Sequence, residues 1–307
     1  MPTTSRVRED LAASWARVAK ELKSPFEELP DFAEFVDGAA NEETAARTLL
    51  EPWLAVFEVE TLWLLALHAA LTEDCKRPAD ARVRSTWLYS GYLCTQATAL
   101  RSLCLSGLGP SAGILLRTII EATRSFVLIL DDSNLAAEFI GATNADARSL
   151  WRKQLSGRGA RSGFERALTI FPADLREEII KWFDLDSGTY SQLVHPTSEA
   201  AFLACFPLAF DSTRASTGVI GRRSLVDWHV LERASKILWF LSRFLSRSLL
   251  GLLPGHARIR NFDSADFLQS AVKIGFYVLG EVSLRYWTAE PPGEGLDSQL
   301  AVTPVAR

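Results

Sequence analysis

Two oppositely charged residues one helical turn apart are the first candidates for chemistry in this chain. Arg117 and Glu121 lie in the apolar segment 113–130, where Arg124 completes a narrow polar stripe. Residues four positions apart are neighbours on an α-helix, so the first two side chains can form an ion pair. A helix this apolar must be largely enclosed, so its polar stripe either meets solvent through a slot or faces other polar groups. The pair is therefore an internal salt bridge or a solvated edge, or one of its members lines a polar cavity.

A hydroxyl group beside an imidazole forms the second candidate. Ser191 and His195 would share one face of a helical turn, with Tyr190 directly before them. Such a pair is the minimum for base-assisted nucleophilic attack. A serine hydrolase also needs an oxyanion site, and the chain contains no Gly-x-Ser-x-Gly elbow. His195 therefore either caps a helix end, bonds a buried carbonyl group, or belongs to a polar cluster.

The two segments together resemble a known family. The residues from Leu115 to Glu121 read Leu-Leu-Arg-Thr-Ile-Ile-Glu, and further along the chain Ser191 begins a Ser-x-x-x-His-Pro element. This pattern resembles a widespread family of uncharacterised, all-helical bacterial proteins, and the resemblance covers about residues 79–252. It implies a soluble helical bundle with a shared polar cluster of Arg117, Glu121, Ser191 and His195. It implies no particular reaction.

A third candidate is a histidine with arginine residues upstream. Arg222 and Arg223 precede His229 with six and five residues between them. This spacing is similar to the Arg-x(4–6)-His motif of the HEPN helical ribonucleases, which also occur among abortive-infection proteins. The weaker resemblance implies a metal-independent endoribonuclease in which His229 is the acid–base for attack by a 2′-hydroxyl group. Arg222 or Arg223 would hold the phosphate, and a homodimer would bring two motifs together.

The helix expected after Ser224 carries a basic stripe opposite an apolar face. Its members are His229, Arg233, Lys236, Arg243 and Arg247. Basic side chains in such a row can bind the phosphate groups of RNA. A solvated helix face has the same pattern, so RNA binding and an ordinary surface are alternatives here.

The composition excludes several classes of protein. Of 307 residues 48% are apolar and 23% are charged, and the net charge is −4. These values are typical of a globular protein with a real core and give no global reason to expect nucleic acid. The cysteine and histidine residues lack the spacing of a zinc site, and the chain has no phosphate loop or dinucleotide fingerprint. We therefore expect neither a metal nor a cofactor.

The two most apolar windows are expected to be buried helices rather than membrane spans. Residues 49–71 contain three glutamates and residues 237–253 contain two arginines. Each charge at the centre of a bilayer costs roughly 2.5–3.5 kcal/mol on insertion scales. No apolar signal-peptide core precedes them, so the expectation is a cytoplasmic protein without a membrane span.

Apolar residues recur at helical spacing along most of the chain, which predicts an all-α protein. We expect a single bundle of about eight to ten helices, built on a hairpin whose two arms are joined by residues 106–110. The helices are predicted near residues 5–22, 31–36, 41–71 with a break at Pro52, 79–105, 111–130, 134–155, 162–170, 173–183, 224–252 and 264–287. The segment 184–223 is rich in Gly, Pro, Ser and Thr, and is expected to be irregular, apart from one short helix over residues 190–194 and a brief strand at 219–221.

Residues 1–288 are expected to form one domain, with a core at 79–288 and a helical extension at 1–78, followed by a disordered tail at 289–307. The first functional hypothesis is a non-catalytic binding or interaction module with an internal polar cluster, in bacterial stress or phage defence. The HEPN-like ribonuclease is the alternative, and it requires an accessible His229 beside an arginine in a basic cleft. The ligand, the partner and the question of enzymatic activity stay open at this point.

Overall fold

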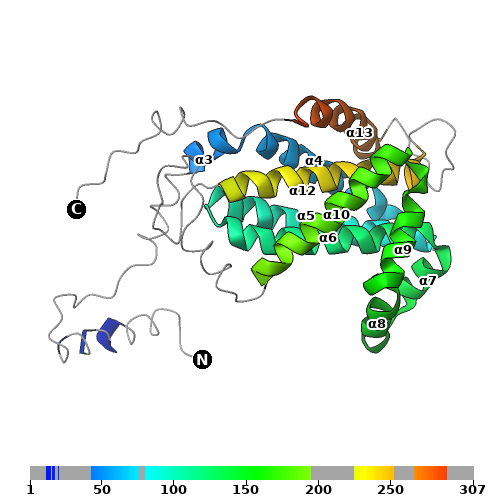
Figure 1. Ribbon diagram of the computed structural model, residues 1–307, viewed down its shortest axis with the longest axis horizontal. Helices are drawn as coiled ribbons and strands as arrows, with labels where there is room; N and C mark the ends of the chain where they lie inside the picture. Colours follow the sequence, from blue (N-terminus) through cyan, green and yellow to red (C-terminus); the bar gives the residue numbers. More distant parts are fainter. Residues whose placement is uncertain are drawn as a thin grey trace. The chain divides into compact units, whose positions relative to one another are not determined.

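The structure is a computed structural model that describes residues 12–14, 16–17, 20, 43–75, 80–194, 225–251 and 266–288 (Figure 1). The chain divides into two units, Met1–Glu42 and Glu43–Arg307. In the first unit the described residues are helical and exposed. In the second unit the described regular structure is entirely helical, which confirms the predicted all-α class.

The predicted hairpin is present as α5 (Ala81–Leu105) and α6 (Gly109–Asp131), which pack along each other. Gly107 ends the first arm with a φ of 65°, a left-handed conformation that glycine adopts without strain. The amide of Leu108 then donates to the carbonyl of Leu103 at 2.9 Å. Pro110 lies in the first turn of α6, where its missing N–H is not needed. The turn residues thus determine where both arms end.

In the second unit two described helices precede the hairpin. The predicted break at Pro52 separates α3 (Glu43–Leu50) from α4 (Trp53–Cys75). Helix α4 packs against α5 and also against two helices from the end of the chain, α12 (Leu225–Leu245) and α13 (Phe267–Arg285). Residues 43–75 therefore contribute to the hydrophobic core of the body, and the second unit begins at Glu43.

Helix α12 is the central helix of the body. It packs against α4, α5, α6 and α13, and Figure 1 shows it running between α4 and the hairpin. Most of its side chains are buried, including Trp228 and Phe240, because neighbouring helices cover it on several sides. It continues into the π-helical turn η3 (Ser246–Leu250) and ends at Gly251, whose φ is 58°.

Helix α4 is the one described helix that is long and apolar enough to cross a membrane by length and composition alone, over Trp53–Thr72. About 44% of that stretch is buried inside the body. Its inner face contacts three other helices, and the Glu60 carboxyl group is buried there beside Ser283 of α13. Core helices of soluble proteins have this same composition, so a membrane span is not indicated.

The segment after the hairpin is divided more finely than predicted. Residues 134–155 form α7 (Ser133–Gly141), α8 (Asn144–Leu150) and the π-helical η1 (Trp151–Leu155), rather than one helix. Asp132 caps α7 through bonds from the amides of Asn134 and Leu135, and Gly141 ends it. The next helix is α9 (Gly157–Ala167), followed by the short 3₁₀ turn η2 (Leu168–Ile170).

Helix α10 (Ala173–Val194) overturns part of the expected irregular segment, because it continues through residues 184–194. A glycine in a helix interior costs only about 1 kcal/mol, and no proline lies between Ala173 and Pro196. Burial of Phe183 and Tyr190 along α10, which packs against α6, can offset that cost. Residues 195–223, with the strand considered near 219–221, lie outside the described residues.

Candidate functional site

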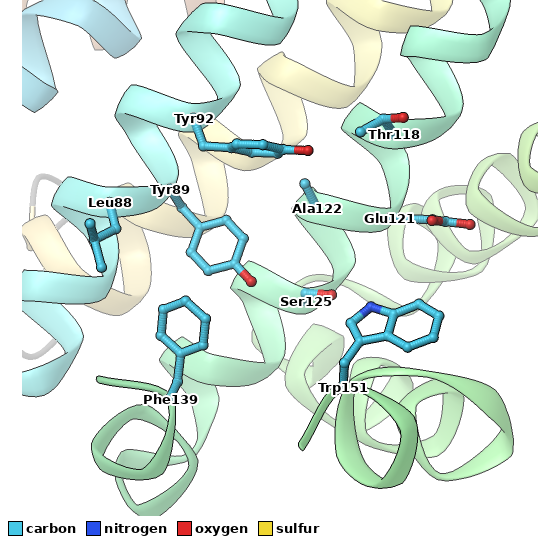
Figure 2. A pocket seen from close by; sticks show the side chains of 9 residues that line it. All are labelled: Leu88, Tyr89, Tyr92, Thr118, Glu121, Ala122, Ser125, Phe139 and Trp151. Atoms are coloured by element: carbon cyan, nitrogen blue, oxygen red, sulfur yellow. The ribbon is translucent and has the colours of Figure 1, made fainter. Parts of the chain in front are cut away.

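A pocket of about 450 Å³ opens between α5, α6, α7 and η1 (Figure 2). It is a surface pocket whose walls are largely apolar and aromatic. Of its nine lining residues, Glu121 is the only charged one. The lining consists of Leu88, Tyr89, Tyr92, Thr118, Glu121, Ala122, Ser125, Phe139 and Trp151.

Helical spacing explains why the two arms of the hairpin supply most of this lining. Tyr89 and Tyr92 are three residues apart on α5, so both lie on the side that faces α7 and η1. On α6 the lining positions follow an i, i+3, i+4, i+7 pattern, from Thr118 to Ser125. One face of each helix therefore forms part of the pocket, while the other faces of both helices enter the core.

The floor of the pocket is built from stacked aromatic rings. The ring of Tyr89 stacks on Phe126 with centroids 4.9 Å apart and packs at a tilt against Phe139 at 5.4 Å. Burial raises the pKa of the Tyr89 phenol, and a hydrogen bond with Ser125 offsets this only in part. The phenol is therefore neutral near pH 7 and has a fixed orientation. Figure 2 shows its oxygen directed toward Ser125.

Two large aromatic residues stand at the rim. Tyr92 is 44% exposed and Trp151 is 48% exposed. Figure 2 shows them on opposite sides of the opening, one from α5 and one from the start of η1. Trp151 opens a π-helical turn, a variant of helix geometry that is frequent at functional sites. Exposed aromatic surface around a concave site is typical of a binding surface.

The predicted ion pair is formed at the edge of this pocket. The Nε of Arg117 donates to Oε1 of Glu121 at 2.9 Å. The side chains are 28% and 47% exposed, so the pair is a partly solvated edge rather than an internal bridge. Of the predicted binding residues, Glu121 is thus placed in the pocket lining, with Arg117 orienting its carboxylate.

The side chain of Arg124 lies apart from those of Arg117 and Glu121, the other two members of the predicted stripe. Its Nη2 donates to the carbonyl of Phe183 at 3.4 Å and lies 3.8 Å from the carboxylate of Asp184, both on α10. Its guanidinium also lies over the rings of Phe164 and Phe183. Burial lowers the pKa of this guanidinium. Arg124 therefore joins α6 to α9 and α10, away from the pocket.

The other predicted binding residues are on or beyond α10. Tyr190 is buried on α10, a helix that packs against α6. Ser191 belongs to the same helix, but its side chain and the whole of His195 lie outside the described residues. The expected meeting of Arg117 and Glu121 with His195 stays a prediction.

His229 lies near the start of α12 with 53% of its side chain exposed. Its Nδ1 is 3.2 Å from Oε2 of Glu232, one turn further along the helix. Burial alone would raise the pKa of Glu232, but hydrogen bonds from His229 and Lys236 and the charge of Lys236 lower it to about 2. Arg222 and Arg223 lie outside the described residues.

The predicted basic stripe does not form a continuous solvent-facing surface. Lys236 is buried, donates to Glu232 at 2.7 Å, and lies over the rings of Trp53 and Trp287. Arg243 lies 3.7 Å from the ring centroid of Phe276 and donates to its backbone carbonyl.

Arg247 also contacts a carbonyl and a ring: it donates to the carbonyl of Ile170 and lies over the ring of Phe171. The physical reason is that α12 is enclosed by other helices. Its long basic side chains therefore pack their stems and charges against aromatic rings and backbone carbonyl groups. His229 is exposed and Arg233 is half-buried, but buried Lys236 and the ring-packed Arg243 and Arg247 interrupt the row.

The aromatic part of the pocket was missed in the sequence. The signal that was available is local: Tyr89 and Tyr92 on one face of α5, and Thr118, Glu121 and Ser125 on one face of α6. Phe139 and Trp151 offered no such signal, because their place depends on how α7 and η1 pack on the hairpin.

No protein-family model, curated protein or solved structure matches this chain. Within the described ranges, no group of three or more His, Cys, Asp or Glu side chains is placed to hold a metal ion.

Proposed function

We propose that this protein is a non-catalytic binding module that holds a small organic molecule in the pocket between α5, α6, α7 and η1. The observation that carries the proposal is the rim, where Tyr92 and Trp151 keep about half of their surface exposed around a concave site. A volume of about 450 Å³ lies within the range of small-molecule sites, which runs from about 300 to 1,000 Å³. The same proposal places the protein in the bacterial cytoplasm, with a role in stress or phage defence.

The fixed polar groups support binding of one ligand in one orientation. The Tyr89 phenol is held by stacking and by Ser125, and the Glu121 carboxylate is held by Arg117. Groups that are already ordered lose little conformational freedom when a ligand arrives, so more of the contact energy appears as affinity. Few polar groups in an otherwise apolar lining are also the usual composition of a ligand site.

The test is a fragment screen by saturation-transfer NMR on the wild type and on Ala122→Leu. Figure 2 shows Ala122 in the middle of the lining, so the larger side chain would occupy the centre of the pocket. The matched control is Ala99→Leu, an exposed position on α5 outside the lining. We expect fragments to bind the wild type and the control and to be lost from Ala122→Leu. Equal binding by both variants, or no binding by any protein, contradicts the proposal.

An endoribonuclease built on His229 is a second candidate, because its imidazole is exposed and is oriented by the Glu232 carboxylate. In such an arrangement the second ring nitrogen can exchange a proton with a substrate. Incubation of total RNA with the wild type and with His229→Ala, in the presence of a metal chelator, tests this activity. Cleavage that is lost in the variant supports it, and equal cleavage by both proteins, or by neither, contradicts it.

A further inference from the structure

We infer that the ligand of this pocket is an organic cation with a methylated ammonium group. The inference rests on the proposed binding function and concerns the chemistry of the occupant. The lining contains no Lys, Arg or His side chain, while Glu121 supplies a carboxylate and Tyr89 and Ser125 supply hydroxyl oxygens. An anionic ligand would find no cationic partner in this lining. A cationic ligand would find a negative charge and electron-rich rings.

The aromatic residues are placed to surround a cation from more than one side. Tyr92 and Trp151 face the opening from opposite sides, and Phe139 closes the lower wall (Figure 2). The face of an aromatic ring carries negative electrostatic potential and attracts a cation, most strongly where water is partly excluded. Methylated ammonium groups are commonly recognised in this way, by several rings and a nearby carboxylate.

Two arginines of α6 lie near the pocket, and neither belongs to its lining. Arg117 donates its Nε to Oε1 of Glu121 from outside the lining, which fixes the carboxylate at the rim. Arg124, one turn further along α6, is directed at Phe183 and Asp184 instead. The space between the rings is therefore not filled by an arginine from this helix.

Methylation of the ligand nitrogen follows from the small number of acceptors. A primary ammonium has three N–H donors, and each needs an acceptor when water is removed. The surface of the lining is mainly ring and aliphatic carbon, and some of its hydroxyl groups are already bonded, Ser125 with Tyr89 and Thr118 with the backbone carbonyl of Ile114. A methylated ammonium has few or no N–H groups and presents carbon to the rings, so it leaves no donor unsatisfied.

The experiment compares two probes of equal shape and different charge by isothermal titration calorimetry. The probes are choline and its neutral carbon isostere 3,3-dimethylbutan-1-ol. We expect choline to bind the wild-type protein about tenfold more tightly than the isostere, the sum of two modest ring contacts. Tyr92→Leu keeps the apolar wall but removes the ring, so the preference for choline should fall severalfold. Tyr277→Leu, an exposed tyrosine on α13 outside the pocket, is the matched control and should leave it unchanged.

A second variant tests the carboxylate. Glu121→Gln should weaken choline binding and leave binding of the neutral isostere unaltered. Equal affinity for the two probes, or loss of preference in Tyr277→Leu as well, overturns the inference about the cation. If fragments bind in a manner that Ala122→Leu abolishes and choline does not bind, the cation is overturned and the binding function stands. If neither fragments nor choline bind the wild type, both proposals fail.

Discussion

At the scale of single residues, the described core contains a carboxyl group that folding places in an unfavourable environment. Glu60 on α4 is 1% exposed, and the hydroxyl of Ser283 on α13 donates to its Oε1 at 3.5 Å. Burial raises the pKa of Glu60 well above its usual range, against smaller opposing effects from Ser283 and from the charge of Arg243. A raised pKa in the folded state means that folding favours the protonated acid.

The raised pKa of Glu60 predicts that the free energy of unfolding falls as the pH rises. Above its unfolded pKa, near 4.5, the unfolded chain releases this proton while the folded chain keeps it, so each further pH unit favours unfolding. Glu60→Gln removes the titration and should have a higher free energy of unfolding than the wild type at pH 8, with little difference at pH 4. Urea denaturation at both values measures this, with the exposed Glu281→Gln as control. A lower stability of Glu60→Gln at pH 8 would contradict the prediction.

The lowered pKa of Glu232 predicts that the free energy of unfolding falls as the pH is lowered. Its pKa is lowered to about 2 because bonds from His229 and Lys236 outweigh burial. Its contribution to stability is therefore present above the unfolded pKa near 4.5 and is lost as pH falls from there toward 2. Glu232→Gln should be less stable than the wild type at pH 6, and the difference should shrink at pH 2.5. Acid titrations followed by circular dichroism test it, and a constant difference across that range would be inconsistent with the assigned cause.

At the scale of elements, helices α4 and α13 meet at a point where only a small side chain fits. A Cβ on Gly275 would lie 2.7 Å from Cδ1 of Trp63, whose indole donates to the carbonyl of Val272 at 2.9 Å. The Trp63 ring would have to shift to admit an alanine, and the buried hydrogen bond would be disturbed.

Gly275→Ala should therefore lower the free energy of unfolding by about 1–3 kcal/mol, although alanine is the better helix former. Gly141→Ala is the matched control, since a Cβ there meets nothing within 4 Å, and its effect should be neutral or slightly stabilising. Urea denaturation of both variants gives the comparison. Equal effects at the two positions would show that the packing at Trp63 does not limit residue 275.

The elements that the sequence predicts well are those set by local chemistry. The hairpin follows from Gly107 and Pro110 at the turn, and the Arg117–Glu121 pair follows from their spacing on one helix. Contacts between elements are not contained in such spacing. Arg124 could not be assigned to α10, and Trp151 could not be assigned to a pocket, because both depend on which face of the hairpin the later helices cover.

The basic stripe on α12 is less exposed than its pattern indicates, for a related reason. The spacing correctly aligns Lys236 and Arg243 on one helix, but a pattern of charges indicates exposure only when the helix lies at the surface. Here the helix is central, and the two cations are enclosed by Trp53, Trp287 and Phe276. The spacing of charged and apolar residues describes a single helix. It does not show how many other helices pack around that helix.

At the scale of the whole molecule, the described hydrophobic core lies entirely within the second unit. It extends from Leu49 on α3 to Leu279 on α13, and none of the described residues before Glu43 contributes to it. A chain that starts at Glu43 should therefore keep its midpoint of thermal unfolding within about 2 °C of the full chain, a change that corresponds to about 1 kcal/mol or less. Differential scanning calorimetry of both proteins tests this. A substantially lower midpoint for the shorter chain would show that residues 1–42 stabilise the body.

The bond between Trp63 and Val272 also has a consequence for biosynthesis. Its two partners are 209 positions apart in the sequence, so α4 leaves the ribosome long before the helix that will cover it has been translated. At about 5–20 residues per second the delay is on the order of 10–40 s. During that interval the apolar face of α4 is available to bind chaperones. Slow codons or a truncated message between the two helices would prolong its exposure.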